Sequence, residues 1–274
     1  MIKGSTRVAA VIGWPVEHSR SPQLFEAAFA AAGIDAVMIP IGVPHDSLEL
    51  VIGALRAMRA LGASVTLPHK LAAAQLCDEL SPSAREIGAA NCLRVEGGRL
   101  FGHNTDCHGF TDALSAAGFA PEDKRCVILG AGGAARAVAY GLRAADAASI
   151  DVIARRPQRV AWTAARPWTP VELRGSFARA DLLVDATPMG LHEGDAASAE
   201  AVPLDELRPG AWVATLVYHR TTGLIERAKQ RGYSTVDGRG MLLHQGARAF
   251  ALWTGTAPPI QAMQRALDAA LDGT

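Results

Sequence analysis

A glycine-rich stretch between two hydrophobic segments has the composition of a phosphate-binding turn. It begins at Gly130, follows the apolar run 125–129 and leads into an alanine-rich segment, residues 132–142. This order predicts a buried strand, a tight turn and a helix. Gly130 would permit the turn, and Gly132 would let a pyrophosphate approach the backbone at the positive end of the helix. An ordinary tight turn in a protein rich in alanine and glycine is the alternative.

Three arginines after the next apolar run bear on which nucleotide would bind. Arg155, Arg156 and Arg159 follow residues 148–154, and the only acid nearby, Asp151, lies near the middle of that run. An NAD site would need an acidic residue at the end of the strand to bind the ribose hydroxyls. Arginines instead suit a 2′-phosphate, which a guanidinium binds through two parallel hydrogen bonds. The pattern therefore predicts NADP, with a solvated basic turn as the alternative.

The first part of the chain carries polar residues just beyond the ends of predicted strands. Ser19 and Ser21 precede a helix that Ser21 and Pro22 would begin, with Ser21 as its cap. Two hydroxyls beside exposed helix N–H groups could bind a carboxylate, although simple capping also explains Ser21. Lys70 stands just past a predicted strand, where α/β sheets place ligand-binding groups. A solvated helix start would explain Lys70 equally, and helix capping would explain Asp106.

The elements that would position these residues fall into two groups. Strands are predicted at residues 7–12, 37–41, 63–67 and in a hairpin around 96–98, with helices between them. After a linker at 119–124, strands are predicted at 125–129, 148–154, 180–185, 211–217 and 233–236, with a polar loop at 193–202. Helices at 241–253 and 260–271 close the chain. The pattern predicts an α/β fold with two lobes, in which the last helices return to the first lobe.

Composition excludes several classes of protein. The 274 residues include 27 basic and 27 acidic side chains, which gives no reason to expect a nucleic acid or an anionic membrane as partner. The four cysteines have neither CxxC nor zinc-site spacing, so we expect reduced thiols, no metal and a cytoplasmic protein. Apolar stretches are too short to span a membrane.

Several motifs in a fixed order resemble the shikimate dehydrogenase family over nearly the whole chain. The matching stretches are residues 18–22, 65–70, 90–91, 104–106, 130–137, 186–190, Tyr218 and 237–241 through Gln245. In that family an N-terminal lobe binds the substrate and a Rossmann lobe binds NADP. The resemblance implies a substrate-binding domain at 1–105, completed by 240–274, and an NADP-binding domain at 106–239.

The resemblance also implies a reaction and roles for individual residues. The reaction is reversible hydride transfer between NADP and the ring alcohol of shikimate, giving 3-dehydroshikimate. The implied catalytic pair is Lys70 and Asp106. The residues implied to contact the substrate are Ser19, Ser21 and Tyr218 at the carboxylate and Thr66, Lys70, Asn91, Asp106 and Gln245 at the ring hydroxyls. The residues predicted to bind the cofactor are Gly130, Ala131, Gly132, Gly133, Ala134, Arg155, Arg156, Arg159, Thr187, Met189, Leu216 and Gly238.

The chemistry of a lysine and an aspartate fits carbonyl reduction. The reaction creates an alkoxide that needs a proton and nearby positive charge, and a lysine supplies both. A neighbouring aspartate can orient the lysine and accept a proton from the adjacent hydroxyl. We therefore expect Lys70 and Asp106 to act as one unit.

Some residues differ from those usual in the family, and they leave the substrate open. The differing residues are Ser64, Cys92, Cys107, Ala154 and Thr215, and the segment after Tyr218 is about one residue short. Quinate or an amino analogue would keep the carboxylate and vicinal hydroxyls of shikimate. Further alternatives are an NAD(P) enzyme acting on an amino acid or folate, and a non-catalytic protein that binds NADP and a shikimate-like acid to regulate a partner. A monomer or a homodimer is expected.

Overall fold

The computed structural model describes residues 2–190 and 202–273 in two compact units. The first unit comprises Met1–Asp106 and Leu243–Thr274, and the second comprises Cys107–Leu242. Helices α5 (Asp106–Ala116) and α10 (Gly238–Thr254) each cross from one unit to the other along the chain. Most of the predicted polar loop at 193–202 lies outside the described residues.

The first unit contains a mixed six-stranded sheet with the order β2-β1-β3-β5-β6-β4. Strands β1, β2 and β3 are parallel, whereas β5 is antiparallel to both β3 and β6. The strands are β1 (Arg7–Gly13), β2 (Ala36–Gly42), β3 (Gly62–Val65), β4 (Glu79–Leu80), β5 (Cys92–Glu96) and β6 (Arg99–His103). The other elements are α1 (Ser21–Ala31), η1 (His45–Ser47), α2 (Leu48–Ala57), α3 (Lys70–Gln75), α4 (Pro82–Ile87) and α11 (Ile260–Asp272).

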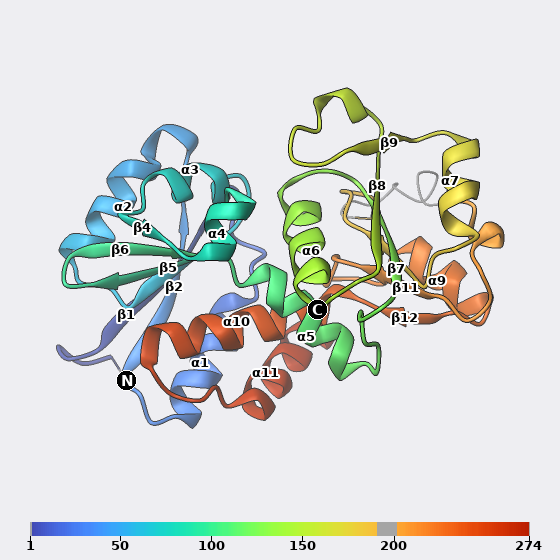
Figure 1. The fold of residues 1–274 in the computed structure, drawn as a ribbon. Helices are drawn as coiled ribbons and strands as arrows, with labels where there is room; N and C mark the ends of the chain where they lie inside the picture. Colours follow the sequence, from blue (N-terminus) through green and yellow to red (C-terminus); the bar gives the residue numbers. More distant parts are fainter. Residues whose placement is uncertain (1, 191–201, 274) are drawn as a thin grey trace. The chain divides into compact units, whose positions relative to one another are not determined.

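Side-chain alternation on β1 gives this sheet two buried faces, which helices cover (Figure 1). Ala10 and Ile12 pack with Ile52 and Leu55 of α2 on one face. On the other face, Trp253 of α10 donates from Nε1 to the backbone oxygen of Leu93, at 2.9 Å. Helix α11 packs against α1 on that side. Because β1 is buried on both faces, its hydrophobic run is nearly continuous.

Strand direction brings four chain segments to one edge of this sheet. The carboxyl ends of β1 and β3 lie there because the two strands are parallel. The amino end of β5 lies beside the end of β3, and the end of β6 lies beside the start of β5, where Cys92 pairs with His103. The residues that follow or precede these ends therefore share one edge.

The second unit is a parallel six-stranded sheet with the order β12-β11-β10-β7-β8-β9. This is the doubly wound Rossmann order, with its switch point between β7 and β10. The strands are β7 (Arg125–Leu129), β8 (Ser149–Ala154), β9 (Ala165–Pro167), β10 (Leu182–Asp185), β11 (Trp212–Thr215) and β12 (Ser234–Val236). The other elements are α6 (Gly133–Ala144), η2 (Pro157–Arg159), α7 (Pro170–Phe177), η3 (Leu204–Glu206) and α9 (Gly223–Gln230).

Helices cover both faces of the second sheet as well (Figure 1). Val127 and Leu183 pack with Phe177 of α7 and Ile225 of α9 on one face. On the opposite face, Ile128 and Val184 pack with α5 and α6. The α/β architecture with a Rossmann-type unit and C-terminal helices belonging to the first unit agrees with the fold predicted from the sequence.

Several short or glycine-containing elements were not predicted. Strands β4 and β9 and helix α7 had no counterpart in the prediction, and α10 begins at Gly238 rather than at residue 241. The glycines suggested a turn there, but close packing explains them. A Cβ at Gly238 would lie 2.2 Å from the backbone oxygen of Leu216, and one at Gly240 would lie 2.9 Å from the Cβ of Ala113.

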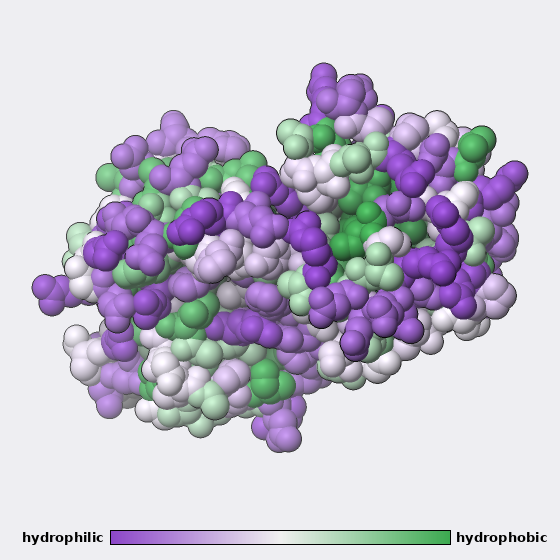
Figure 2. Space-filling model, in the orientation of Figure 1, coloured by the Kyte–Doolittle hydropathy of each residue, from purple (hydrophilic) through white to green (hydrophobic). Residues whose placement is uncertain are grey.

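The visible surface is mixed in polarity. On the face drawn in Figure 2, hydrophobic residues form separate patches among hydrophilic ones. Within the described residues, we find no helix of the length and hydropathy needed to cross a membrane.

Candidate active site

An ion pair joins two residues that are far apart in the sequence. Lys70 Nζ lies 2.7 Å from Asp106 Oδ2. Lys70 is the first residue of α3, after the end of β3, and Asp106 follows the end of β6, so both stand at the edge described above. The side chain of Asp106 is 9% exposed and that of Lys70 is 24% exposed. The pair is therefore largely withdrawn from water while the ammonium remains accessible.

Asn91 connects this ion pair to helix α10. Its Nδ2 donates to Asp106 Oδ1 at 2.8 Å and lies 3.4 Å from Gln245 Oε1. Its Oδ1 accepts from the backbone N–H of Thr105 at 2.6 Å. All four residues, Asn91, Thr105, Asp106 and Gln245, are buried. Both oxygens of Asp106 thus have a donor, and the carboxylate is fixed in orientation.

Thr105 was not among the predicted site residues, yet it belongs to this network. Its hydroxyl lies 3.0 Å from Asn91 Nδ2, and it is 3% exposed. The only sequence signal was its place between Asn104 and Asp106. Gln245 lies on the part of α10 that belongs to the first unit, so residues from four separate stretches of sequence, including that of Lys70, meet here.

The two predicted serines stand at the start of α1. Ser19 Oγ accepts from the backbone N–H of Ser21 at 3.3 Å, and Ser21 is the first residue of the helix. The prediction that Ser21 caps the helix is wrong, since Arg20 occupies the cap position and makes no side-chain capping bond. The turn between β1 and α1 also reaches the end of β3, where Trp14 N–H donates to the backbone oxygen of Leu67 at 3.0 Å.

Thr66 lies directly after β3 at the same edge. Its backbone N–H donates to the oxygen of Ile12 at 2.9 Å, and its methyl group occupies the space where Gly13 would carry a Cβ. Ser64, two residues earlier, is 6% exposed, and its hydroxyl has no hydrogen-bond partner in the part of the chain that the structure describes. Tyr218 belongs to the second unit, where its ring makes an edge contact with His219.

The glycine-rich turn connects β7 to α6 in the second unit. Gly130 has φ +100°, a value that favours glycine, and a Cβ there would lie 3.0 Å from the backbone oxygen of Ala186. Gly132 precedes the first residue of α6, and Gly132 and Gly133 have open space where a Cβ would stand. Ala131 accepts at its backbone oxygen from Trp162 Nε1, at 3.2 Å, and Ala134 lies in the first turn of α6. The amino end of α6 is thus open to an anion.

The arginines after β8 are exposed. Arg155, Arg156 and Arg159 make no ion pair with any residue in the described ranges 2–190 and 202–273. They directly follow the carboxyl end of β8, beside the end of β7. Three unpaired guanidinium groups at this end of the sheet fit the 2′-phosphate of NADP.

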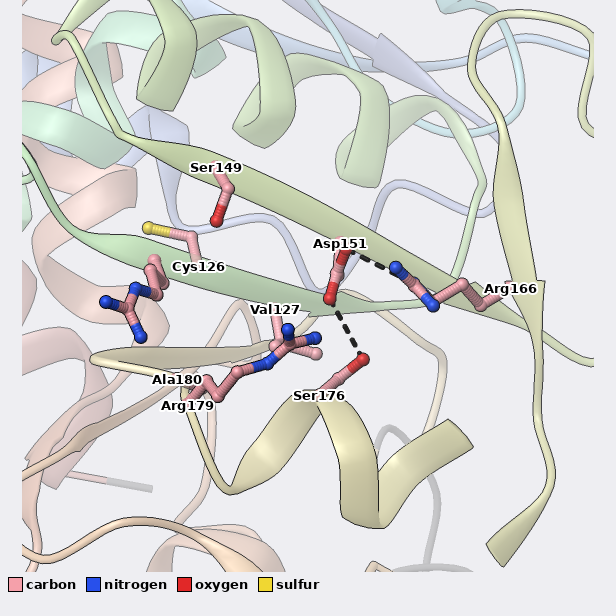
Figure 3. Close-up of a pocket in the computed structure, with 9 residues that line it drawn as sticks. Cys126, Val127, Ser149, Asp151, Arg166, Ser176, Arg179 and Ala180 are labelled. Carbon is pink, nitrogen blue, oxygen red and sulfur yellow. Dashed lines mark hydrogen bonds and ion pairs between the residues drawn. The ribbon is translucent and has the colours of Figure 1, made fainter. Parts of the chain in front are cut away.

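Asp151, in contrast, is engaged elsewhere. Its carboxylate accepts from Arg166 Nε at 3.2 Å and from Ser176 Oγ at 3.0 Å (Figure 3). These groups line a pocket of about 320 Å³ between the first halves of β7 and β8 and helix α7. The amino ends of these strands are opposite to the glycine-rich turn, so Asp151 does not occupy the position of a ribose-binding acid.

The loop after β10 lies against the glycine-rich turn. Asp185 Oδ1 accepts from the backbone N–H of Thr187 at 3.0 Å and from its hydroxyl at 2.6 Å. Thr187 Oγ1 in turn accepts from the N–H of Met189 at 3.1 Å. Burial raises the pKa of Asp185 to about 6, although the bonds from Thr187 lower it. Asp185 was missed by the sequence analysis. Leu216 and Gly238, two further predicted cofactor residues, meet through the close backbone contact described above.

The remaining groups with metal-binding or nucleophilic chemistry are not arranged for it. Among the residues that the structure describes, no three His, Cys, Asp or Glu side chains are grouped to hold a metal ion. Burial raises the pKa of the Cys77 thiol to about 11 and that of Cys126 to about 12, and it raises the pKa of Cys92 further. These thiols therefore stay protonated and unreactive near neutral pH.

Comparison with known families agrees with this geometry. The family model described as "Shikimate dehydrogenase substrate binding domain" matches residues 11–93, and the one described as "Shikimate 5'-dehydrogenase C-terminal domain" matches residues 238–267. A protein of Symbiobacterium thermophilum named shikimate dehydrogenase (NADP(+)) is 40% identical, and the match covers 99% of this chain and 97% of that protein.

Solved structures extend the match to the whole fold. Shikimate 5-dehydrogenase from Thermus thermophilus, in complex with NADP(H) and shikimate, is 36% identical with a TM-score of 0.86, covering 97% of this chain and 100% of that one. The 5-ketofructose reductase of a Gluconobacter species is 31% identical with a TM-score of 0.83, covering 97% and 99%. With this identity over nearly its full length, the chain belongs to the shikimate dehydrogenase family.

Proposed function

We propose that this protein is an NADP-dependent oxidoreductase that interconverts 3-dehydroshikimate and shikimate. The observation that carries the proposal is the 2.7 Å contact between Lys70 Nζ and Asp106 Oδ2 at an edge shared with Asn91 and Gln245. The relatives named shikimate dehydrogenase (NADP(+)) and the Thermus thermophilus complex with NADP(H) and shikimate support the reaction and the cofactor.

Lys70 and Asp106 form the catalytic pair in this proposal. In the direction of reduction, the Lys70 ammonium donates a proton to the carbonyl oxygen as negative charge develops on it. Asp106 holds that ammonium through Oδ2, while Asn91 holds Oδ1, so the proton donor has a defined position. In the direction of oxidation, the uncharged lysine accepts the hydroxyl proton. NADPH, when bound, supplies the hydride.

The substrate is a cyclic acid with hydroxyl groups. Thr66, Asn91 and Gln245 present hydroxyl and amide groups that suit the ring hydroxyls, since each can both donate and accept. Ser19 and Ser21 present hydroxyls at the amino end of α1, where the helix favours an anion, and Tyr218 would complete the carboxylate site. The first unit would therefore bind the substrate.

The second unit would bind the cofactor. Gly130 to Ala134 would hold the pyrophosphate at the amino end of α6, and Arg155, Arg156 and Arg159 would hold the 2′-phosphate. Thr187, Met189, Leu216 and Gly238 would line the nicotinamide end of the site. We propose that residues 1–105 with 240–274 form the substrate-binding domain and that residues 106–239 form the cofactor-binding domain.

A matrix of substrates and cofactors tests the proposal. Initial rates are recorded at 340 nm with shikimate, quinate and the ketone 5-ketofructose against NADP(H) and NAD(H). We expect the largest kcat/KM for shikimate with NADP. A larger value for 5-ketofructose would assign the chain to the chemistry of its Gluconobacter neighbour, and one for quinate would change the substrate alone. Shifts in melting temperature with NADP and shikimate but no turnover would favour a regulatory binding protein.

Two further properties belong to the same proposal. Cys77, Cys92 and Cys126 form no disulfide with one another, as is usual for proteins of a reducing compartment. We therefore propose that the protein is cytoplasmic. It would act as a monomer or a homodimer, which light scattering after gel filtration distinguishes.

A further inference from the structure

Asp185 is a buried carboxylate with no role so far, and it stands at the switch point of the Rossmann sheet. It is the last residue of β10, and it lies opposite Leu129, the last residue of β7. The order of strands reverses between these two, and ligands of such sheets bind in the crevice outside this point. Asp185 is 1% exposed, so water does not compensate its charge.

Among the described residues, both hydrogen bonds to the Asp185 side chain come from the loop that follows it. Two donors of Thr187, the backbone N–H and the hydroxyl, converge on Oδ1. Because the Thr187 hydroxyl gives its proton to Asp185, its lone pairs are available to the Met189 N–H. One carboxylate oxygen therefore organises two successive turns of backbone.

This loop is held against the glycine-rich turn. The N–H of Ala186 donates to the backbone oxygen of Leu129 at 2.9 Å, and the methyl group of Thr187 would lie 3.2 Å from a Cβ on Gly130. At the far end, Arg220 Nε donates to the backbone oxygen of Gly190 at 2.7 Å. The loop is thus fixed at its start by Asp185, at its end by Arg220, and along its side by the turn.

We propose that Asp185 is the positioning residue for the cofactor side of the active site, because it shapes the Ala186–Gly190 loop against Gly130. The role belongs to the Oδ1 acceptor, which an asparagine would keep. The second oxygen, Oδ2, has no hydrogen-bond partner among residues 2–190 and 202–273. The loop shape therefore requires the Oδ1 acceptor but not the negative charge of an acid. Asp185→Asn keeps the acceptor and removes the charge, so mutation can separate the two.

The first test uses hydrogen exchange on the protein without ligand, so it does not depend on the proposed activity. We expect the amides of residue 187 and Met189 to be protected. Both should exchange at least 10-fold faster in Asp185→Ala, whereas in Thr187→Val the Met189 amide, which loses its acceptor, should do so. They should stay protected in Asp185→Asn and Thr187→Ser, which keep the acceptor and the hydroxyl. Unchanged exchange in Asp185→Ala, or equal loss in Asp185→Asn, would overturn the inference.

The second test measures NADPH binding by its fluorescence, and it rests on the proposed cofactor. We expect the Kd for NADPH to rise about 10-fold or more in Asp185→Ala, and to stay within about 3-fold in Asp185→Asn. Asp151→Asn is the control, since it removes a partly buried carboxylate from the first half of β8, which β7 separates from β10. Loss of NADPH binding in Asp151→Asn as large as in Asp185→Ala would show a general effect on stability and overturn the role.

The two tests fail in different ways. If no variant or wild-type protein binds NADPH but the exchange pattern appears as expected, the proposed cofactor is wrong and the role of Asp185 in the loop stands. If NADPH binds and Asp185→Ala binds it as wild type does, the positioning role is wrong and the cofactor stands.

Discussion

At the scale of single residues, protein groups rather than water compensate the charge of the Asp106 carboxylate. Asp106 receives one donor on each oxygen, from Lys70 and from Asn91. The lysine keeps enough exposure to meet a substrate. Removing either partner leaves a charge with incomplete compensation, which is costly in a buried setting.

Replacing Lys70 by alanine removes the proton donor but leaves the cofactor residues untouched. We expect kcat to fall by a factor of about 10² or more, as is usual for loss of a general acid, with the Kd for NADPH within about 2-fold of wild type. Steady-state rates and fluorescence titration measure the two quantities. Near-normal turnover would remove Lys70 from the mechanism.

Asp185 gives the stability of the protein a definite pH dependence. Its pKa is raised from 3.8 to about 6 by burial, so the folded protein binds this proton more tightly than the unfolded chain. The stabilisation is complete below pH 3.8 and is lost as the pH rises through about 6, a change of about 3 kcal/mol. Asparagine does not titrate.

We therefore expect the stability of Asp185→Asn relative to wild type, measured by urea unfolding, to be about 2 kcal/mol greater at pH 8 than at pH 4.5. The other titrating groups are the same in both proteins, so their contributions to the free energy of unfolding cancel in this comparison. A difference between the two proteins that stays constant across this range would show that Asp185 does not titrate as described.

At the scale of elements, we propose that the loop after β8 distinguishes NADP from NAD through the charge of its three arginines. We expect alanine at Arg155, Arg156 or Arg159 to raise KM for NADP by about 10-fold or more each, since a hydrogen bond to a charged group contributes about 1.5–3 kcal/mol. KM for NAD should not change. Arg174→Ala is the control, because that exposed arginine pairs with Glu206 on the same unit. Equal effects on NADP and NAD would contradict a 2′-phosphate site.

How much of each element could be predicted depended on whether its signal was local. The turn at Gly130 and the helix begun by Ser81 and Pro82 follow from residues next to one another, and Ser81 Oγ accepts from Ala84 N–H at 3.2 Å as a cap should. The three-residue strand β9 has too few residues for a periodic pattern. The glycines at the start of α10 were wrongly predicted to form a turn. They are required because Leu216 and Ala113, which are distant in sequence, leave no space for a side chain.

The site itself could be predicted only in part. The position of Lys70 after a strand end made it a candidate from sequence alone. Its partner Asp106 was predicted only from the family resemblance, because the antiparallel pairing of β5 and β6 decides which residues share the edge. Asp185 and Thr105 escaped notice because neither differs in local pattern from an ordinary strand or loop residue. Their roles arise from hydrogen bonds made only in the folded chain.

At the scale of the whole molecule, the first unit depends on residues at both ends of the chain. Leu267 of α11 is fully buried, and α11 packs against α1. We expect Leu267→Ala to destabilise the first unit by about 2–5 kcal/mol. Hydrogen exchange should show faster opening of β1 and β3 while β7 and β10 keep their protection.

The reverse variant provides the control for this prediction. Leu224→Ala removes a buried side chain of α9 in the second unit, so β7 and β10 should lose protection and β1 should keep it. Loss of protection throughout the chain in both variants would mean that the two units unfold as one.

The pairing of α1 with α10 has a consequence during synthesis on the ribosome. The ring of Phe25 lies 4.8 Å from that of Trp253, and the ring of Phe29 lies 5.7 Å from that of Phe250. More than two hundred intervening residues must be translated before these aromatic partners leave the exit tunnel. Until then the nascent polypeptide presents a bare aromatic surface to its surroundings, which is a natural target for chaperones that bind growing chains.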